Sequence, residues 1–483
     1  MKILFIIPKI DNSQIKGEYP HIGVGYLSEV LLQNKINHEV IDMTLGYEQD
    51  YLIGYIKKYE PDVIAITTYS YRFNNTKSII ELLIKNKQQF DYKILLGGPH
   101  VSCLRKESMF EGVDFEIKGE GEETLKEFCK SFDKKNRDYS KILGLIWRKY
   151  DKKIKSSKII ENPDRPWITD LDKIPFPKYT KFEFQKYICY NDRYIRINTS
   201  RGCPYQCIFC SVKFVTGNQF RARSPKNLLE EIHYWYDHGF KTFEFVDDNF
   251  TLNKKRVIEF CNLLRNENLK ITFNLFGGVR VDRVDKELLI TMKKCGLNKI
   301  IYGVETTNEQ VLKNMKKAIT LQQIKNTFKL TRELLIPFGA FFSIGHPGQT
   351  YKDVIEDLKF IKKQKIHSIT YCNMVPYPGS ELEKWVDLNA EYIIPKNQFL
   401  ESVSYSSDMP IYATKEFNKY ERIKALKKAH SFCKKELFKM KLGPLLGTSF
   451  WLITKINFFD NLVNKLLNTN VGRFIFNLIK RDD

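Results

Sequence analysis

The sequence predicts an α/β protein with two successive parallel sheets and a mainly helical C-terminal segment. Two observations carry this prediction. Short apolar runs alternate with helical stretches over about the first 140 residues, and a second alternation of the same kind follows a proline-rich break. We therefore expect a first unit over 1–140, a linker over 141–190, a second unit over 191–385 and a helical region over 386–483.

The first unit is predicted to be a doubly wound, Rossmann-like sheet. Its strands are apolar throughout, as is typical of parallel strands that are covered by helices on both faces. The predicted strands are Lys2–Pro8, His38–Asp42, Val63–Thr67, Lys93–Leu96 and Phe115–Lys118. The predicted helices are Gly23–Gln33, Asp50–Tyr59, Ser78–Asn86 and Glu123–Phe132.

Three successive strands of this unit end in residues suited to a ligand. Ligands of such sheets bind at the carboxyl ends of the strands, and glycines let the backbone approach a bulky molecule. We expect a ligand at this edge, although plain tight turns would show the same residues. The residues are Tyr69-Ser70, Gly97-Gly98-Pro99-His100 and Gly119-Glu120-Gly121-Glu122.

The linker is predicted to contain a short hairpin followed by a semi-rigid, proline-rich connector. The hairpin strands are Gly144–Tyr150 and Ile154–Ile160, and the prolines are Pro163, Pro166, Pro175 and Pro177.

The second unit is predicted to be a partial β/α barrel, with its chemistry at the carboxyl ends of the strands. Its predicted strands are Tyr194–Thr199, Thr242–Val246, Thr272–Phe276, Lys299–Gly303, Ala340–Ile344 and Ser368–Met374. The predicted helices are Pro225–His238, Lys254–Asn266, Asp285–Cys295, Asn308–Met315, Leu321–Leu335 and Tyr351–Lys363.

Composition narrows the class of protein. Hydrophobic residues make up 43% and charged residues 28% of 483 residues, which excludes wholesale disorder and favours more than one core. The 10 cysteines form no dense disulfide framework, so we expect a reducing, cytoplasmic compartment. The apolar run at the start of the chain is short and stops at Pro8, unlike a secretory signal.

The formal net charge of +21 attracts anions such as nucleic acid, phosphorylated metabolites or an anionic membrane. The lysines are scattered and form no block, which favours biased composition as the cause. We therefore expect no specific nucleic-acid partner.

Three cysteines in the second unit carry the chemistry. Cys203, Cys207 and Cys210 form a CxxxCxxC pattern directly after the first barrel strand. Thiolates are the protein ligands of iron–sulfur clusters, and three on one loop can hold three corners of a cubane and leave the fourth iron open. Structural zinc is the alternative, but it usually takes four ligands, and no fourth Cys or His lies close by.

This loop, with an aromatic residue before the last cysteine, resembles that of the radical S-adenosylmethionine (radical SAM) superfamily. The resemblance implies that Cys203, Cys207 and Cys210 are the catalytic metal ligands of a 4Fe–4S cluster. It further implies that S-adenosylmethionine binds the open iron and is cleaved to a 5′-deoxyadenosyl radical, with Phe209 against the adenine. An electron donor such as flavodoxin or ferredoxin is implied as a partner.

The resemblance extends along the strand ends. Asp247 and Asp248 are similar to the segment that holds the amino group of the cofactor, and Arg280 is expected to pair with its carboxylate. Glu305 resembles the glutamate near the ribose and methionine, and Ser343 follows on the fifth strand, where His346 replaces the expected glutamate. For each residue, an ordinary strand-end turn or a buried salt bridge is the alternative.

The first unit resembles the cobalamin-binding domain that this superfamily often carries. The segments that carry the resemblance are Pro20–Leu27, Leu96–Ser102 and Lys118–Thr124. It implies that cobalamin lies against Tyr69, Ser70, Gly97, Gly98, Gly119, Glu120 and Gly121. The Asp-x-His-x-x-Gly segment that supplies a lower axial ligand in other cobalamin domains is absent, so we expect neither His21 nor His100 to be that ligand.

The resemblance implies a cobalamin-dependent methylation of an unactivated carbon in a small-molecule or lipid substrate. Cyclisation, ring rearrangement or carbon–carbon coupling on the same architecture is the alternative, and a non-catalytic iron–sulfur protein is a third. Residues 438–480 mix basic and apolar positions at helical spacing. They are expected either to pack on the barrel or to give a peripheral membrane contact. Cys372 lies near the end of the sixth strand and could face the substrate or be an inert core thiol.

Overall fold

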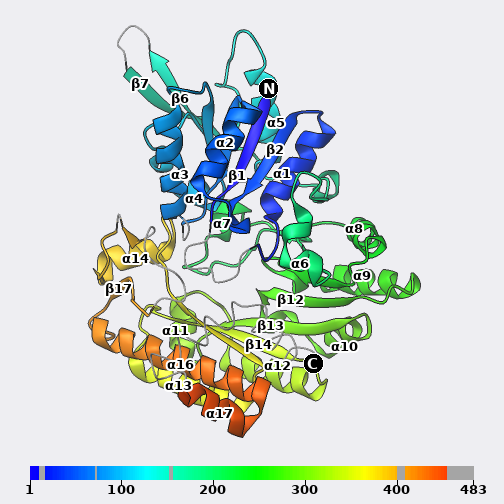
Figure 1. The fold of residues 1–483 in the computed structure, drawn as a ribbon. Helices are drawn as coiled ribbons and strands as arrows, with labels where there is room; N and C mark the ends of the chain where they lie inside the picture. Colours follow the sequence, from blue (N-terminus) through cyan, green and yellow to red (C-terminus); the bar gives the residue numbers. More distant parts are fainter. Residues whose placement is uncertain (10–16, 71–72, 152–155, 397, 400–407, 454–483) are drawn as a thin grey trace.

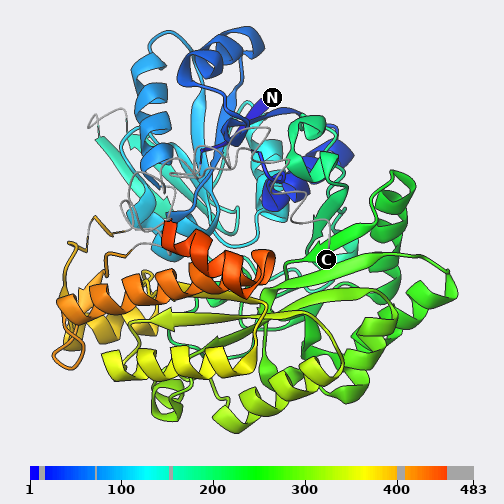
Figure 2. The same cartoon turned by 60° about the horizontal axis from the view of Figure 1, so that its bottom comes forward.

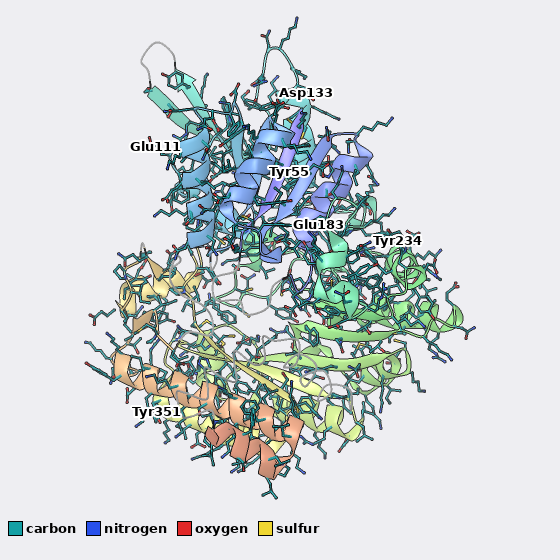
Figure 3. All side chains as sticks on the ribbon, in the orientation of Figure 1. Tyr55, Glu111, Asp133, Glu183, Tyr234 and Tyr351 are labelled. Carbon is teal, nitrogen blue, oxygen red and sulfur yellow. The ribbon has the colours of Figure 1, made fainter. Side chains whose placement is uncertain are left out.

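The computed structural model describes residues 1–9, 17–70, 73–151, 156–396, 398–399 and 408–453. An N-terminal sheet with its helices lies above a second sheet with its own helices (Figure 1). The linker residue Glu183 lies between the two sheets (Figure 3), and there it accepts a hydrogen bond from the hydroxyl of Tyr47.

The N-terminal sheet has seven strands in the order β2-β1-β3-β4-β5-β6-β7, of which β1 to β5 are parallel. The strands are β1 (Lys2–Ile7), β2 (Asn37–Asp42), β3 (Val63–Thr67), β4 (Lys93–Gly97), β5 (Phe115–Ile117), β6 (Leu145–Asp151) and β7 (Ser156–Glu161). The helices are α1 (Ile22–Gln33), α2 (Gln49–Tyr59), α3 (Phe73–Asn86), α4 (Pro99–Leu104) and α5 (Glu122–Phe132). All five predicted parallel strands are confirmed.

The hairpin that we assigned to the linker is part of this sheet. Strand β6 pairs antiparallel with β5, with Phe115 opposite Trp147 and Ile117 opposite Leu145. The pairing covers the edge of β5, which would otherwise present unpaired backbone groups. The remaining connector contains the short helix α6 (Ile188–Asn191).

The second sheet has six parallel strands in the order β15-β14-β13-β12-β11-β8, so neighbours in sequence are neighbours in space. The strands are β8 (Tyr194–Ile197), β11 (Thr242–Phe245), β12 (Thr272–Val279), β13 (Leu297–Glu305), β14 (Phe338–Ile344) and β15 (Ser368–Asn373). The helices between them are α8 (Pro225–Asp237), α9 (Lys254–Asn266), α10 (Lys286–Lys294), α11 (Glu309–Asn314), α12 (Leu321–Glu333) and α13 (Tyr351–Gln364). Every predicted strand and helix of this unit is confirmed.

The C-terminal helices flank the free edge of this sheet. Helix α16 (Lys419–Leu442) runs beside β15 and α13, and α17 (Pro444–Ile453) packs on α16 (Figure 2). Tyr351 at the start of α13 lies under α16, where the ammonium nitrogen of Lys424 is 5.2 Å from its ring centroid (Figure 3). None of the helices in the described ranges is long and apolar enough to cross a membrane.

Small elements complete the described chain. Two of them frame the cysteine loop: β9 (Ser200–Arg201) pairs antiparallel with β10 (Arg221–Ala222), and α7 (Val212–Val215) follows the last cysteine. Helix α14 (Glu381–Asn389) and the strands β16 (Glu391–Tyr392) and β17 (Tyr412–Ala413) lie between β15 and α16.

Candidate active site

The three cysteines lie on the loop between β9 and α7. Gly202 begins the loop with a φ of +82°, and an added Cβ there would lie 2.2 Å from the carbonyl oxygen of Gln219, so only glycine fits. The backbone amide of Cys203 donates to the carbonyl of Gly217 at 3.3 Å, and that of Ile208 donates to the carbonyl of Met315 at 3.1 Å. The loop is therefore fixed to the segment that follows α11.

The donor set of the loop fits an iron–sulfur cluster. Among the described residues, no group of three His, Cys, Asp or Glu side chains is arranged so that it could bind a single metal ion. A cubane cluster needs a wider spacing of its ligands, because each thiolate binds a different iron atom. Burial raises the pKa of Cys203, Cys207 and Cys210, the last to about 12, so iron binding must release their protons.

Asp247 organises the start of this loop. Its Oδ1 accepts hydrogen bonds from the amide and hydroxyl of Thr199, at 3.0 and 2.7 Å, and from the hydroxyl of Ser200 at 2.6 Å. Its Oδ2 is buried and has no partner, and burial raises the pKa of the carboxyl. Asp248 is half-buried and accepts from the hydroxyl of Thr216 at 3.0 Å. Asp247 thus keeps one oxygen available beside the cysteine loop.

Glu305 and Lys317 form a buried ion pair at the end of β13. The Nζ of Lys317 lies 3.0 Å from Oε1 of Glu305, and Ser343 donates to Oε2 at 2.8 Å. Burial raises the pKa of Glu305, but Lys317 outweighs it, and the net pKa is lowered. Burial alone lowers the pKa of Lys317, and Glu305 reverses the sign. Lys317 was not predicted, because one lysine among many carries no sequence signal.

A hydrogen-bonded chain continues from this pair to His346. The hydroxyl of Ser343 donates to Glu305, so it must accept from Nε2 of His346, 2.6 Å away. The Nδ1 of His346 is then an acceptor, and it is buried without a partner. Burial lowers the pKa of His346 to about 4, so the ring is neutral. Phe209 of the cysteine motif meets this ring edge-on, with centroids 5.5 Å apart.

Arg280, which was predicted to pair with the cofactor carboxylate, contacts other protein groups in this structure. Its Nε donates to Asp282 at 2.9 Å, and its Nη1 donates to the carbonyl of Lys317 at 2.8 Å. The guanidinium carbon lies 3.5 Å from the ring centroid of Tyr205, inside the cysteine motif. Because its nitrogens are engaged within the protein, Arg280 braces the cysteine loop in this structure.

The strand ends of the N-terminal sheet leave polar atoms and open backbone for a ligand. Gly98 has a φ of +105°, and an added Cβ would lie 2.8 Å from the carbonyl of Thr68, whereas a Cβ at Gly97 would meet nothing nearer than 3.8 Å. The hydroxyl of Ser70 lies 3.0 Å from Nδ1 of His100, whose Nε2 is buried without a partner. Burial lowers the pKa of His100 to about 4. This edge therefore fits a bulky neutral or anionic group better than a cation.

The other residues of this edge pack against their surroundings. The Nδ1 of His21 accepts from the amide of Val24 at 3.0 Å and caps α1, while its ring lies 5.5 Å from that of Tyr69. Gly119 has a φ of +71°, and a Cβ there would lie 3.4 Å from the ring of Trp167. A Cβ at Gly121 would lie 3.3 Å from Leu27.

Glu120, which was predicted to bind a cofactor, joins the two sheets in this structure. Its carboxylate accepts from Nη1 of Arg201 at 3.0 Å, from Nη1 of Arg221 at 2.9 Å and from the amide of Ile168 at 2.8 Å. Glu122 accepts from Nη2 of Arg201 at 2.6 Å. All four charged side chains are at most 11% exposed. The strand end of β5 is thus clamped to the residues that border the cysteine loop.

Two further side chains lie near the end of β14. Arg422 of α16 is 1% exposed, and its Nη2 has no hydrogen-bond partner. It lies against Gly345, where an added Cβ would be 2.8 Å from Nη1. Cys372 stands opposite Ser343 in the sheet, and burial raises the pKa of its thiol to about 12, as expected for an unreactive cysteine.

Comparison with family models and known proteins agrees with this geometry. The model of the B12 binding domain matches residues 8–129, and that of the radical SAM superfamily matches residues 197–361. An uncharacterized methyltransferase of Pyrococcus horikoshii is 30% identical over 442 residues, which is 89% of this chain and 92% of that protein. The anaerobic magnesium-protoporphyrin IX monomethyl ester cyclase of Rubrivivax gelatinosus is 28% identical over 398 residues, 79% of this chain and 69% of that protein.

A solved structure shares the fold over both units. It is the radical S-adenosylmethionine methyltransferase TsrM of Kitasatospora setae with cobalamin and a [4Fe–4S] cluster bound. The TM-score is 0.68 at 16% sequence identity, covering 82% of this chain and 81% of that one.

Proposed function

This chain belongs to the radical SAM superfamily, in the branch that carries a B12 binding domain, and on that premise we propose that it methylates an unactivated carbon. The observation that supports the proposal most is the clamp of Glu120 on Arg201 and Arg221. It holds the strand-end edge of the B12 binding domain against the loop of the three cysteines. A methyl donor and a radical source must act on one substrate, so their sites need such a fixed relation.

The chain offers residues for each cofactor. When bound, the 4Fe–4S cluster, S-adenosylmethionine and cobalamin would supply a radical that abstracts a hydrogen atom from carbon, and a methyl group. Cys203, Cys207 and Cys210 would hold the cluster. The free Oδ2 of Asp247 suits an ammonium group, and the buried ammonium of Lys317 suits a carboxylate. Ser70, Gly97 and Gly98 would line the cobalamin face.

The protein residues control charge and water around these sites. Lys317 keeps Glu305 ionised in a buried setting, so the carboxylate can accept hydrogen bonds without taking up a proton. The neutral ring of His346 offers one acceptor nitrogen and adds no charge next to a reactive radical. Ser343 and His346 are buried, and the half-buried ring of Phe209 packs on His346, so bulk water is excluded from the end of β14.

The substrate is proposed to be a small molecule or lipid that reaches the carboxyl ends of β13 to β15. The unpartnered nitrogens of His346 and Arg422 are the polar atoms available to orient it there. A buried guanidinium without a carboxylate partner favours a substrate with a carboxylate or phosphate group.

A second candidate function is cyclisation or rearrangement on the same architecture. It is favoured by the 28% identity to a cyclase that acts under anaerobic conditions. The two candidates differ in what becomes of S-adenosylmethionine. A methylating enzyme yields S-adenosylhomocysteine as well as 5′-deoxyadenosine, whereas a cyclase needs only the second product.

The test is an anaerobic reconstitution with iron, sulfide and cobalamin. We expect about one cobalamin per chain, and both S-adenosylhomocysteine and 5′-deoxyadenosine after reduction in the presence of S-adenosylmethionine. Protein that keeps its cluster and yields 5′-deoxyadenosine but takes up no cobalamin would support the second candidate and contradict methylation.

A further inference from the structure

The cysteine loop opens to solvent on one side. Pro204 and Gln206, between the first two cysteines, are exposed, and Tyr205 beside them is half-buried. With Lys313, Lys316 and Ala318 they line a shallow hollow on the surface of the protein. We call these six residues together with Arg283 the loop face.

The other sides of the loop are covered. Arg201, two residues before Cys203, is held by Glu120 and Glu122 of the N-terminal sheet. Phe209, just before Cys210, packs on His346 toward the strand ends of the barrel. The loop face is therefore a side on which an external molecule can contact residues between the first two cysteines directly.

Positive charge surrounds the loop face. Lys313 is exposed, the side chain of Lys316 is 54% exposed and that of Arg283 is 44% exposed. The nearby carboxylate of Glu381 is paired with Lys316, and its pKa is lowered by Lys316 and also by Lys213 and Lys384. One carboxylate under the influence of three lysines indicates a net positive field over this surface.

Asp282 does not reverse that field. It is shared between Arg280, 2.9 Å away, and Arg283, 3.8 Å away, so it is outnumbered by its partners. Arg283 also donates to the hydroxyl of Tyr205, which fixes a cation at the rim of the hollow. The loop face thus combines a mainly apolar hollow with a basic rim, as protein-docking surfaces do.

We propose that the loop face docks an acidic one-electron carrier protein, which reduces the cluster through Pro204–Gln206. This inference rests on the proposed function, because it requires a cluster on Cys203, Cys207 and Cys210. The carrier loses one electron and the cluster gains it, and no bond of this chain forms or breaks. The hollow fits a protein contact better than a nucleic acid, whose phosphates call for an extended basic stripe.

The test compares two double variants with the same change in net charge. Lys313→Glu with Lys316→Glu reverses the rim of the loop face. Lys362→Glu with Lys363→Glu reverses two exposed lysines of α13, far along the chain from the hollow. Bleaching of the cluster absorbance is followed by stopped flow with fully reduced, acidic flavodoxin, and separately with dithionite.

We expect the loop-face variant to be reduced by flavodoxin at least roughly tenfold more slowly at low salt, with the difference shrinking as salt is added. The α13 variant should behave like the wild type. Dithionite, which needs no docking surface, should reduce all three proteins at similar rates and give the same yield of 5′-deoxyadenosine. Equal flavodoxin rates for the two variants, or an equal loss in both, would overturn the inference.

The outcomes separate this inference from the proposed function. If dithionite reduces the cluster but no protein forms 5′-deoxyadenosine, the proposed function fails while the flavodoxin rates still decide the docking surface. A loop-face variant that loses binding of a short RNA but keeps its flavodoxin rate would assign the surface to nucleic acid and overturn the proposal.

Discussion

Glu120 at the end of β5 and Arg221 of β10 form a buried ion pair between the two sheets, with 2.9 Å between Oε2 and Nη1. Their side chains are 5% and 6% exposed, and 101 residues separate them along the chain. Arg201 shares the same carboxylate and stands two residues before Cys203. The ion pair at the edge of the first domain therefore fixes an arginine that lies two residues before the first cysteine of the cysteine loop.

Replacing Glu120 by Ala should destabilise the junction strongly. Removing one partner of a buried ion pair leaves an uncompensated charge and costs about 3–5 kcal/mol; here Arg221 loses its carboxylate partner, and Arg201 keeps only Glu122. We expect a lower thermal midpoint together with a lower cobalamin-to-protein ratio. Glu356→Ala, which breaks an exposed pair with Lys359, is the control and should change neither. Unchanged cobalamin uptake by Glu120→Ala would show that the clamp is not needed for the cobalamin site.

Replacing Cys207 by Ala should remove the cluster and all cleavage of S-adenosylmethionine. Two thiolates cannot hold a cubane on this loop. The measurement is the cluster absorbance and the yield of 5′-deoxyadenosine under dithionite. Cys433→Ser, on α16 and away from the loop, should keep both. Continued formation of 5′-deoxyadenosine by Cys207→Ala would contradict the assignment of the metal ligands.

The strands of both sheets could be predicted from the sequence because short segments rich in apolar residues, such as β1 and β3, alternate regularly with helical stretches. Helix α4 (Pro99–Leu104) was missed, since Gly97-Gly98-Pro99 indicates a turn and six residues are too few for a helical period. The hairpin over 145–161 was found, but its place in the sheet was not, because sequence alone does not tell which strand edge it pairs with.

The residues of the site show the same contrast between local sequence patterns, which could be predicted, and long-range contacts, which could not. The cysteines could be predicted because all three ligands lie within eight residues of sequence. The contacts of Glu120 with Arg201 and Arg221 could not be predicted, since these partners are 81 and 101 residues away. Lys317 carries no signal at all, because its role follows from Glu305, which only the fold brings within 3.0 Å of it.

Replacing Lys317 by Met should make the enzyme sensitive to acid. In the wild type, Lys317 holds the pKa of Glu305 below its ordinary value, so the carboxylate stays ionised and its contribution to stability is lost only as the pH falls through that lowered pKa. Without Lys317, burial dominates and raises the pKa of Glu305. As the pH is lowered, we expect the yield of 5′-deoxyadenosine to begin to fall at a higher pH in the variant than in the wild type. Parallel pH profiles would contradict this role of Lys317.

Two of the buried histidines, His100 and His346, should make stability depend on pH. The pKa of His100 and of His346 is lowered to about 4, so the unfolded chain binds more protons than the folded one below pH ~6.5. Stability is therefore fully present above that pH and falls toward pH ~4, by about 1 kcal/mol for each histidine at pH ~5.5.

The measurement is the urea midpoint at several pH values. His100→Gln and His346→Gln should each flatten the dependence, whereas His233→Gln, at an exposed site, should not. A wild-type midpoint that does not change over this range would contradict neutral histidines.

Helix α17 should give weak contact with anionic lipid. Leu445, Leu446 and Leu452 are 83%, 70% and 53% exposed, and lysines of α16 such as Lys439 lie beside this apolar surface. Apolar side chains next to basic ones suit the interface of an anionic membrane.

The expectation made for 438–480 reaches beyond the described residues, which end at 453, so the test uses α17 alone. We expect the full chain to co-sediment with vesicles containing phosphatidylserine, and Leu445→Ser with Leu446→Ser to reduce the bound fraction by roughly threefold or more. Leu335→Ser, at a residue that is 79% exposed on the barrel, is the matched control. Equal binding by both variants, or no binding by the intact protein, would contradict a lipid contact through α17.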